Sequence, residues 1–278
     1  MTLPENTKVA LLGTGTMGRA LGQGLIESSS IEASRLQGTI RHDARLASLR
    51  DRVDFEVGTD NVAAAKGANV VMICTKPVRV REVVAEISAG GALDHNPLIV
   101  SVAAGVRTAE IEAAAARECH VVRAMPNTPC LIGEGMTVIC SGKHADDSHL
   151  DLAQKLFEPL GRVLRLDEDH MDTVTGLSGS GPAFVYVIIE ALSEGGVMMG
   201  LPRQVATELA SQTVKGAARM VLETGRHPAS LKGDVLTPAG CTISALLAME
   251  DGRLRSVLAR GVQEAARTAS QLGEQSSP

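Results

Sequence analysis

The first part of the chain alternates short apolar runs with amphipathic segments. The runs are rich in Val, Ile and Leu without polar alternation, which is typical of parallel strands buried on both faces. Between several of them, apolar residues recur at helical spacing, as at Met17–Glu27, Val80–Ile87 and Thr108–Ala116. This alternation predicts βαβ units around a mainly parallel sheet. The predicted strands are Val9–Leu12, Gln37–Ile40, Val70–Cys74, Leu98–Ala103, Val121–Arg123, Met136–Cys140 and Arg162–Leu166.

After about Asp167 the pattern becomes helical only. Ala, Leu, Met and Glu recur at helical spacing, and Gly200-Leu-Pro202 and Gly225-Arg-His-Pro228 are typical helix stop signals. The sequence therefore predicts an α/β domain over residues 1–166 and an all-α domain over residues 167–278. The predicted helices of the second domain lie near 181–199, 203–224, 242–250 and 253–272.

Composition argues against several classes of protein. The net charge of −5, with no Trp, one Tyr and three Phe, offers neither a basic surface nor stacking platforms for nucleic acid. The N-terminal segment lacks the pattern of a signal peptide, and glycines and Pro182 interrupt the most apolar stretch, Thr173–Ile189, so no membrane span is expected. The five cysteines form no C-x-x-C pair and lie at no metal-ligand spacing from histidine. We therefore expect free thiols, a cytoplasmic protein and no metal site.

A glycine-rich loop directly follows the first predicted strand and precedes a helix. It consists of Gly13, Thr14, Gly15, Thr16, Met17 and Gly18. In this G-x-G-x-x-G pattern the first glycine permits a tight turn, the second a close approach of a pyrophosphate, and the third close packing of helix and sheet. The helix N-terminus then faces the phosphates. The loop predicts a Rossmann-like, doubly wound, dinucleotide-binding domain.

The residues after the second strand bear on the choice of cofactor. An acidic residue there would bind the ribose 2′-hydroxyl of NAD, whereas an arginine would pair with the 2′-phosphate of NADP. Arg41 occupies this place, followed two residues later by Asp43. The sequence favours NADPH and leaves NADH open.

A loop of small residues, Thr237–Thr242, precedes a predicted helix of the second domain. Backbone N–H groups at a helix N-terminus carry partial positive charge and suit a carboxylate. Small side chains let a ligand lie against the backbone. The sequence predicts a seat for a substrate carboxylate made by Ala239, Gly240, Cys241 and Thr242.

The segment from Gly176 to Gly181 resembles the interdomain helix of the β-hydroxyacid dehydrogenases. Val185 and Ile189 stand where that family has its catalytic lysine and asparagine, which argues against this reaction. From about Lys8 to Leu272 the chain instead resembles the pyrroline-5-carboxylate reductases. The motifs that carry this resemblance are the glycine loop, Lys76-Pro77, Ser101-Val-Ala-Ala-Gly105, Arg123-Ala-Met-Pro-Asn-Thr-Pro129, Gly176-Leu-Ser-Gly-Ser-Gly-Pro-Ala183 and Pro238-Ala-Gly-Cys-Thr242.

This resemblance implies NADPH-dependent reduction of the C=N bond of 1-pyrroline-5-carboxylate to L-proline. It also implies a helical dimerisation domain, an active site between two subunits, and a homodimer that a larger ring could contain. Thr242 would act at the ring nitrogen, or cap its helix, or both. Ser180 would line the substrate pocket. The resemblance further assigns Glu168 and Asp234 to the substrate, and Asn61, Cys74, Lys76, Pro77 and Ala104 to the cofactor.

Three residues depart from the pattern of the resembled family. Ala239 replaces a glycine, Cys241 follows Gly240, and Leu236 stands where a smaller residue is expected. They leave open a related reductase of another small cyclic imine or keto acid. A dinucleotide-binding regulator without catalysis is a third hypothesis, which the intact loop Thr237–Thr242 disfavours.

Overall fold

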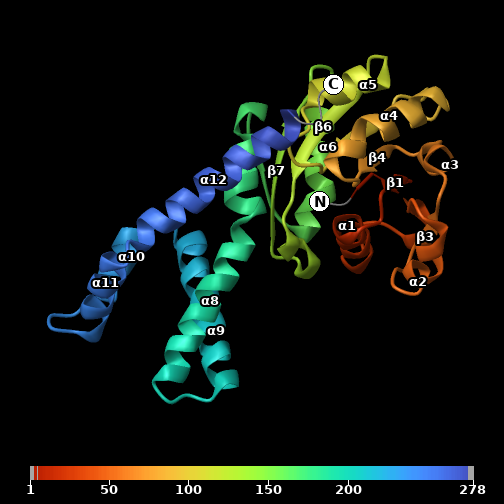
Figure 1. Ribbon diagram of the computed structural model, residues 1–278. Coiled ribbons are helices and arrows are strands. Elements are labelled where there is room, and N and C mark those ends of the chain that lie inside the picture. The colour runs from red at the N-terminus through yellow and green to blue at the C-terminus, as the bar shows by residue number, and fades with distance from the viewer. Residues whose placement is uncertain (1–2, 5, 275–278) are drawn as a thin grey trace. The chain divides into compact units, whose positions relative to one another are not determined.

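Eight strands form one sheet in the computed structural model, which describes residues 3–4 and 6–274 (Figure 1). The strand order is β3-β2-β1-β4-β5-β6-β7-β8, and all neighbours are parallel except the antiparallel pair β6 and β7. The chain winds outward in both directions from β1 and β4, which confirms the predicted doubly wound sheet. The strands are β1 (Val9–Leu12), β2 (Leu36–Thr39), β3 (Glu56–Gly58), β4 (Val70–Ile73), β5 (Leu98–Ser101), β6 (His120–Met125), β7 (Gly135–Ser141) and β8 (Gly161–Arg165).

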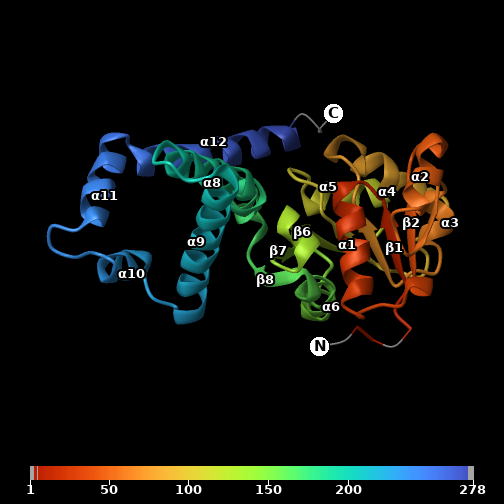
Figure 2. The ribbon, with the colours of Figure 1, turned by 90° about the horizontal axis from the view of Figure 1, so that it is seen from below.

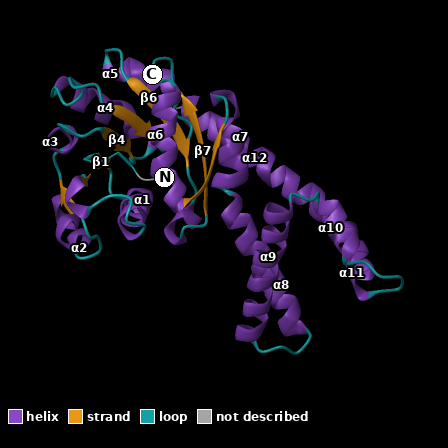
Figure 3. Cartoon of the chain, turned by 180° about the vertical axis from the view of Figure 1, so that it is seen from behind, coloured by secondary structure: helices purple, strands orange, loops and turns teal. Residues whose placement is uncertain are grey.

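Helices cover both faces of this sheet, as the strands between helices in Figure 3 show. Alternate residues of β1 separate into two cores, with Val9 and Leu11 in one and Ala10 and Leu12 in the other. Both faces are therefore buried, which explains the unbroken apolar runs. The first core takes residues from α1 (Thr16–Glu27), α2 (Leu46–Arg50) and α6 (Asp147–Phe157), and the second from α3 (Asn61–Ala65), α4 (Val80–Ala89) and α5 (Thr108–Ala115).

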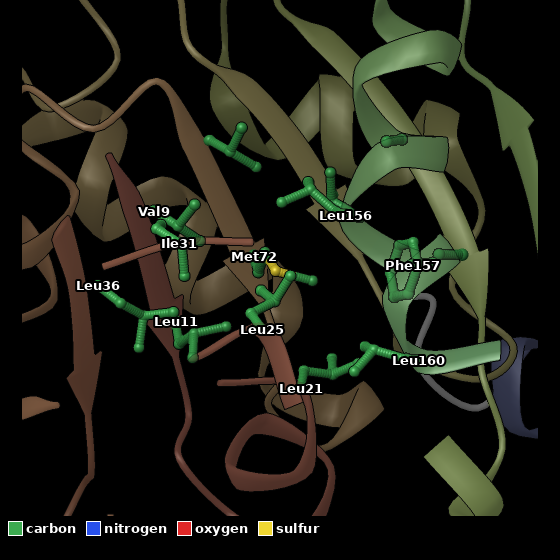
Figure 4. Packing of buried hydrophobic residues seen from close by; sticks show 14 of the residues in the cluster. Val9, Leu11, Leu21, Leu25, Ile31, Leu36, Met72, Leu156, Phe157 and Leu160 are labelled. Atoms are coloured by element: carbon green, nitrogen blue, oxygen red, sulfur yellow. The ribbon is translucent and has the colours of Figure 1, made fainter. Parts of the chain in front are cut away.

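The first core fixes the helix that follows the glycine loop. Leu21 and Leu25 of α1 are fully buried against Leu11 of the sheet, and Phe157 at the end of α6 lies in the same cluster (Figure 4). Fully burying side chains of this size contributes about 1.5–3 kcal/mol each. The position of α1, and with it the glycine loop, is therefore set by core packing.

The chain divides into two compact units. Among the described residues, one unit extends to Ser180 and includes residues 263–274, and the other is Gly181–Val262. Residues 167–180, assigned from the sequence to the second domain, belong with the sheet in this division; they include the short helix α7 (Met171–Val174). The remaining helices are α8 (Gly181–Met198), α9 (Arg203–Thr224), α10 (Pro228–Asp234), α11 (Cys241–Asp251) and α12 (Leu254–Glu274), the last of which spans both units.

The second unit leaves most of its apolar side chains uncovered. Helices α8 and α9 contact each other, as Figures 1 and 2 show from two directions, and their buried residues are only Ser193, Ala206 and Ala210. Tyr186 is 61% exposed and Leu247 is 61% exposed. Helices α8 to α11 thus contain almost no fully buried side chain.

One helical stretch among the described residues, Glu168–Met198, is long and apolar enough to cross a membrane by length and composition. The sequence prediction rejected a span here because glycines interrupt the pattern. The structure corrects that reason: Thr175–Gly179 forms a π-helical turn that leads into α8, so the glycines do not end the helical run. Only 17% of the apolar window is buried within the chain.

Candidate active site

The glycine loop connects β1 to α1, and each of its three glycines has its own steric reason. Gly13 has a φ of +103°, and a Cβ there would lie 2.9 Å from the carbonyl oxygen of Cys74. A Cβ on Gly18 would lie 2.3 Å from the carbonyl oxygen of Gly13. Gly15 has open space where its side chain would be. The loop therefore turns tightly, packs closely on the sheet and leaves its middle accessible, as a pyrophosphate requires.

A chain of hydrogen bonds holds this loop against the neighbouring strand. The Thr14 N–H donates to the Thr39 carbonyl at 2.7 Å, and the Gly13 N–H donates to Thr39 Oγ1 at 3.3 Å. Thr39 Oγ1 donates to Asn61 Oδ1 at 2.7 Å, and Asn61 Nδ2 donates to Glu86 Oε2 at 3.0 Å. Asn61, predicted to lie near the cofactor, is thus connected to the loop by two hydrogen bonds through Thr39. It helps to hold the loop in place.

Two further observations indicate that the loop can bind a dinucleotide. Helix α1 begins after Gly15 without a side-chain cap, so its first N–H groups are free for phosphate oxygens. Thr14 Oγ1 is buried and has no hydrogen-bond partner within the described chain. Gly15, Thr16 and the start of α1 are the residues that would hold the pyrophosphate.

Several other predicted cofactor residues follow the carboxyl ends of β4 and β5. Cys74 directly follows β4, where its N–H donates to the Leu12 carbonyl at 2.8 Å. Burial raises the pKa of its thiol to about 12, so it fills space as an uncharged group. Lys76 is exposed before the turn that begins at Pro77, and Ala104 follows β5. The fold thus brings the predicted residues to the crevice where ligands of doubly wound sheets bind.

Arg123, in the middle of β6, is a buried charge that the sequence analysis missed as a site residue. It is 3% exposed, and its guanidinium lies 3.4 Å from Glu168 Oε1 and 3.1 Å from Asp172 Oδ1. Glu168 also accepts hydrogen bonds from the N–H and Oγ1 of Thr108, both at 2.8 Å. The carboxylate of Glu168, predicted to contact the substrate, is thus engaged by Arg123 and by the start of α5. In the sequence, Arg123 is recognisable as a single charged residue within an apolar predicted strand, where a buried charge needs a partner.

Asn127 connects the segment after β6 to the turn that carries Ser180. Its Oδ1 accepts the Met136 N–H at 2.9 Å, and its Nδ2 donates to the Ser178 carbonyl at 3.0 Å. The Ser180 N–H donates to the Thr175 carbonyl at 2.9 Å and closes the π-helical turn. Such turns are frequent at functional sites. Asn127 therefore positions the predicted pocket residue Ser180.

The predicted carboxylate loop forms a tight turn before α11. The Gly240 N–H donates to the Thr237 carbonyl at 3.0 Å, with Pro238 in the second position and Ala239 in the third. Ala239 has a φ of +58°, which is the conformation that glycine favours in a type II turn. A Cβ on Gly240 would lie 2.3 Å from Thr237 Oγ1, so any side chain at this position would displace the Thr237 hydroxyl.

Thr242 lies in the first turn of α11 but does not cap it. The N-cap is Gly240, which has no side-chain hydrogen bond, and α11 begins at Cys241. This corrects the alternative in which the Thr242 hydroxyl caps the helix. The first N–H groups of α11 and this hydroxyl are available to a ligand. Asp234, by contrast, lies 2.7 Å from the Arg226 guanidinium in an exposed ion pair at the end of α10.

The comparisons with known proteins match both parts of the chain. A family model described as pyrroline-5-carboxylate reductase dimerisation matches residues 168–272, and one described as NADP oxidoreductase, coenzyme F420-dependent, matches residues 8–105. The pyrroline-5-carboxylate reductase of Corynebacterium melassecola is 40% identical over 96% of this chain and 99% of its own. That of Schizosaccharomyces pombe is 39% identical over 95% of this chain and 98% of its own.

Solved structures agree with these relatives. The pyrroline carboxylate reductase of Plasmodium falciparum, solved with NADP bound, superposes with a TM-score of 0.88 at 28% identity and covers 97% of this chain and 99% of its own. The pyrroline-5-carboxylate reductase of Coxiella burnetii gives a TM-score of 0.87 at 32% identity, over 96% of this chain and 99% of its own. A prephenate dehydrogenase of Aquifex aeolicus, at 13% identity and a TM-score of 0.54, shares the fold.

The sheet order and the glycine loop at its switch point define a dinucleotide-dependent oxidoreductase. The helical second half narrows this class. The chain belongs to the pyrroline-5-carboxylate reductase family.

Replacing Glu168 with Ala should destabilise the protein. The change leaves Arg123 buried with one partner fewer and frees the start of α5, so we expect the free energy of unfolding to fall by about 2–4 kcal/mol. Urea denaturation at one fixed protein concentration measures this. Asp169→Ala, at a carboxylate that is 87% exposed, should change it by less than about 0.5 kcal/mol. Unchanged stability with a raised KM for the substrate would instead assign Glu168 to substrate binding.

Replacing Ala239 with Gly should stabilise the turn before α11. A left-handed backbone costs a non-glycine residue about 1–2 kcal/mol, and the greater freedom of glycine in the unfolded chain offsets about 0.5–1 kcal/mol of the gain. We expect the free energy of unfolding to rise by up to about 1 kcal/mol in urea denaturation. Ala217→Gly, at an exposed position in the interior of α9, is the matched control and should lower it by about 0.5–1 kcal/mol. A fall of equal size in both variants would show that Ala239 carries no strain.

Proposed function

We propose that the protein is a pyrroline-5-carboxylate reductase, which transfers a hydride from NADPH to the C=N bond of 1-pyrroline-5-carboxylate and yields L-proline. The observation that carries this proposal is the match to these reductases over nearly the whole chain, glycine loop and carboxylate loop included. When bound, the reduced nicotinamide supplies the hydride to the imine carbon. The ring nitrogen takes up one proton, so the reaction consumes one proton and releases NADP+.

The residues of the chain act by binding and orientation. The uncapped first turn of α11 holds the substrate carboxylate through Cys241 and Thr242 N–H groups, and Gly240 keeps that turn clear of side chains. The Thr242 hydroxyl lies in the same turn and hydrogen-bonds the ring nitrogen. A cyclic imine protonated before binding needs no further acid, so alignment of the two reacting carbons is the main contribution of the protein.

The protein is a homodimer, and the exposed apolar surface of α8 to α11 is what the second subunit covers. Val187 is 64% exposed and Leu209 is 54% exposed, which is unfavourable for a unit left in water. The matching family model describes a dimerisation domain over this part. In our proposal each active site combines the glycine loop of one subunit with the α11 loop of its partner. We further propose that dimers join into a larger ring, and that the apolar stretch Glu168–Met198 serves this assembly in the cytoplasm rather than a membrane.

Two departures in the loop support a second candidate function. Leu236 is larger than the residue expected from the family pattern, and the strained Ala239 belongs to the predicted seat for the carboxylate. A related cyclic imine or keto acid is then the preferred substrate, with the same cofactor chemistry.

An assay of NADPH oxidation separates these candidates. Purified protein, supplied with 1-pyrroline-5-carboxylate, should lose the absorbance of the reduced nicotinamide and accumulate proline. The same assay with NADH measures the cofactor preference, which we expect to favour NADPH. Oxidation only with a different cyclic imine or keto acid would support the second candidate. No oxidation with any of these, from protein that binds NADPH, would overturn the proposed catalytic function.

Replacing Thr242 with Val should lower kcat/KM by about 10- to 100-fold, because it removes a hydrogen bond to a charged nitrogen but keeps the side-chain shape. Thr242→Ser, which retains the hydroxyl, should keep most of the activity. Steady-state rates with 1-pyrroline-5-carboxylate measure both variants. Equal activity of the valine and serine variants would show that the hydroxyl does not act on the ring nitrogen.

A further inference from the structure

A cavity of about 430 Å³ adjoins the glycine loop on the side of β2. It begins at the open face of Gly15 and continues past the end of β2 to α2 and the residues after it. In a doubly wound sheet, this is where the adenosine half of a dinucleotide lies. Its lining residues are Thr14, Gly15, Thr16, Arg19, Ile40, Ala44, Arg45, Ser48, Leu49 and Arg52.

Three arginines from separate elements converge on this cavity. Arg19 comes from α1, Arg45 from the 3₁₀ turn Asp43–Arg45, and Arg52 from just beyond α2. Within the described part of the chain none of the three forms an ion pair or a side-chain hydrogen bond. The uncapped N-terminus of α1 adds partial positive charge beside them. The cavity is therefore strongly electropositive and available to an anion.

The other residues that line the cavity indicate which kind of anion it can bind. No Asp or Glu is among the lining residues, whereas NAD-binding sites place a carboxylate against the ribose 2′-hydroxyl. Ile40, Ala44 and Leu49 provide an apolar wall suited to a flat base. The combination matches a nucleotide that bears a phosphate in place of the free 2′-hydroxyl. Guanidinium groups bind such a phosphate through paired, charge-assisted hydrogen bonds.

We propose that Arg45 and Arg52 determine the cofactor specificity of this protein by binding the 2′-phosphate, while Arg19 strengthens the positive field they share. This proposal rests on the proposed reductase function and deepens it. The sequence pattern indicates Arg41 as the residue that favours NADPH over NADH. We assign this role to the arginines that line the cavity instead. Arg41 follows β2, is exposed and is not among the cavity-lining residues. The two assignments make different predictions for the same measurement.

The test is binding of oxidised cofactors in the absence of substrate. Calorimetric titration of NADP+ and NAD+ gives the two dissociation constants separately. Arg45→Ala and Arg52→Ala should each raise the Kd for NADP+ by about tenfold or more and change the Kd for NAD+ by less than about twofold. Arg162→Ala, an exposed arginine on β8 outside the cavity, is the matched control and should leave both constants unchanged.

A second measurement does not depend on variant stability. In ³¹P NMR of NADP+ bound to the unmodified protein, the guanidinium groups should lower the pKa of the 2′-phosphate below its value in free NADP+. Arg45→Ala should move this pKa back toward the free value. An unchanged pKa on binding to the unmodified protein would overturn the proposal.

Three binding results would also overturn it. They are an unmodified protein that does not prefer NADP+, an equal loss of NADP+ and NAD+ affinity in Arg45→Ala and Arg52→Ala, and a loss of preference confined to Arg41→Ala. Failure of the reductase function is distinguishable from these. It would appear as retained NADP+ selectivity without oxidation of NADPH in the presence of 1-pyrroline-5-carboxylate.

Discussion

The close approach of the backbone after β1 to the backbone after β4 is the constraint on which the candidate site depends. Gly13 lies against the Cys74 carbonyl, and Gly18 lies against the Gly13 carbonyl, at separations that no side chain permits. This contact brings the N-terminus of α1 to the switch point of the sheet and leaves Gly15 facing outward. The apolar core beneath α1 and the hydrogen bonds of Thr39 then keep the loop in place. The backbone N–H groups that would bind a dinucleotide are therefore already in position.

The second half of the chain, unlike the sheet, buries little of itself. Where the sheet is covered by helices on both faces, α8 to α11 bury few of their own residues. In a dimer, a second copy covers their apolar faces and supplies the missing contacts. In the same half, the turn before α11 keeps a left-handed alanine and an uncapped helix end, both of which cost stability. Such costs are typical of a segment shaped by a ligand.

Much of the fold followed from the sequence because its signals are local. Seven strands and the long helices were predicted from apolar spacing and glycine punctuation. The edge strand β3 was missed because Glu56–Gly58 is only three residues long and only its middle residue, Val57, is buried. The role of Glu168 shows the limit of such reasoning. Its contacts with Arg123 and Thr108 join residues 45 and 60 positions apart, and only the folded chain brings them together. The capping alternative for Thr242 likewise depended on which residue begins α11.

The position of the lone tyrosine has a spectroscopic consequence. The chain has no Trp, and its single Tyr is Tyr186, exposed on the apolar surface of α8. The sheet and the glycine loop therefore contribute no phenol or indole signal. The three phenylalanines absorb at shorter wavelengths, so the tyrosine bands in absorbance, circular dichroism and emission report on one helix alone. The burial of that phenol by a second subunit can be followed directly, while the emission of a reduced nicotinamide is read against a background without indole.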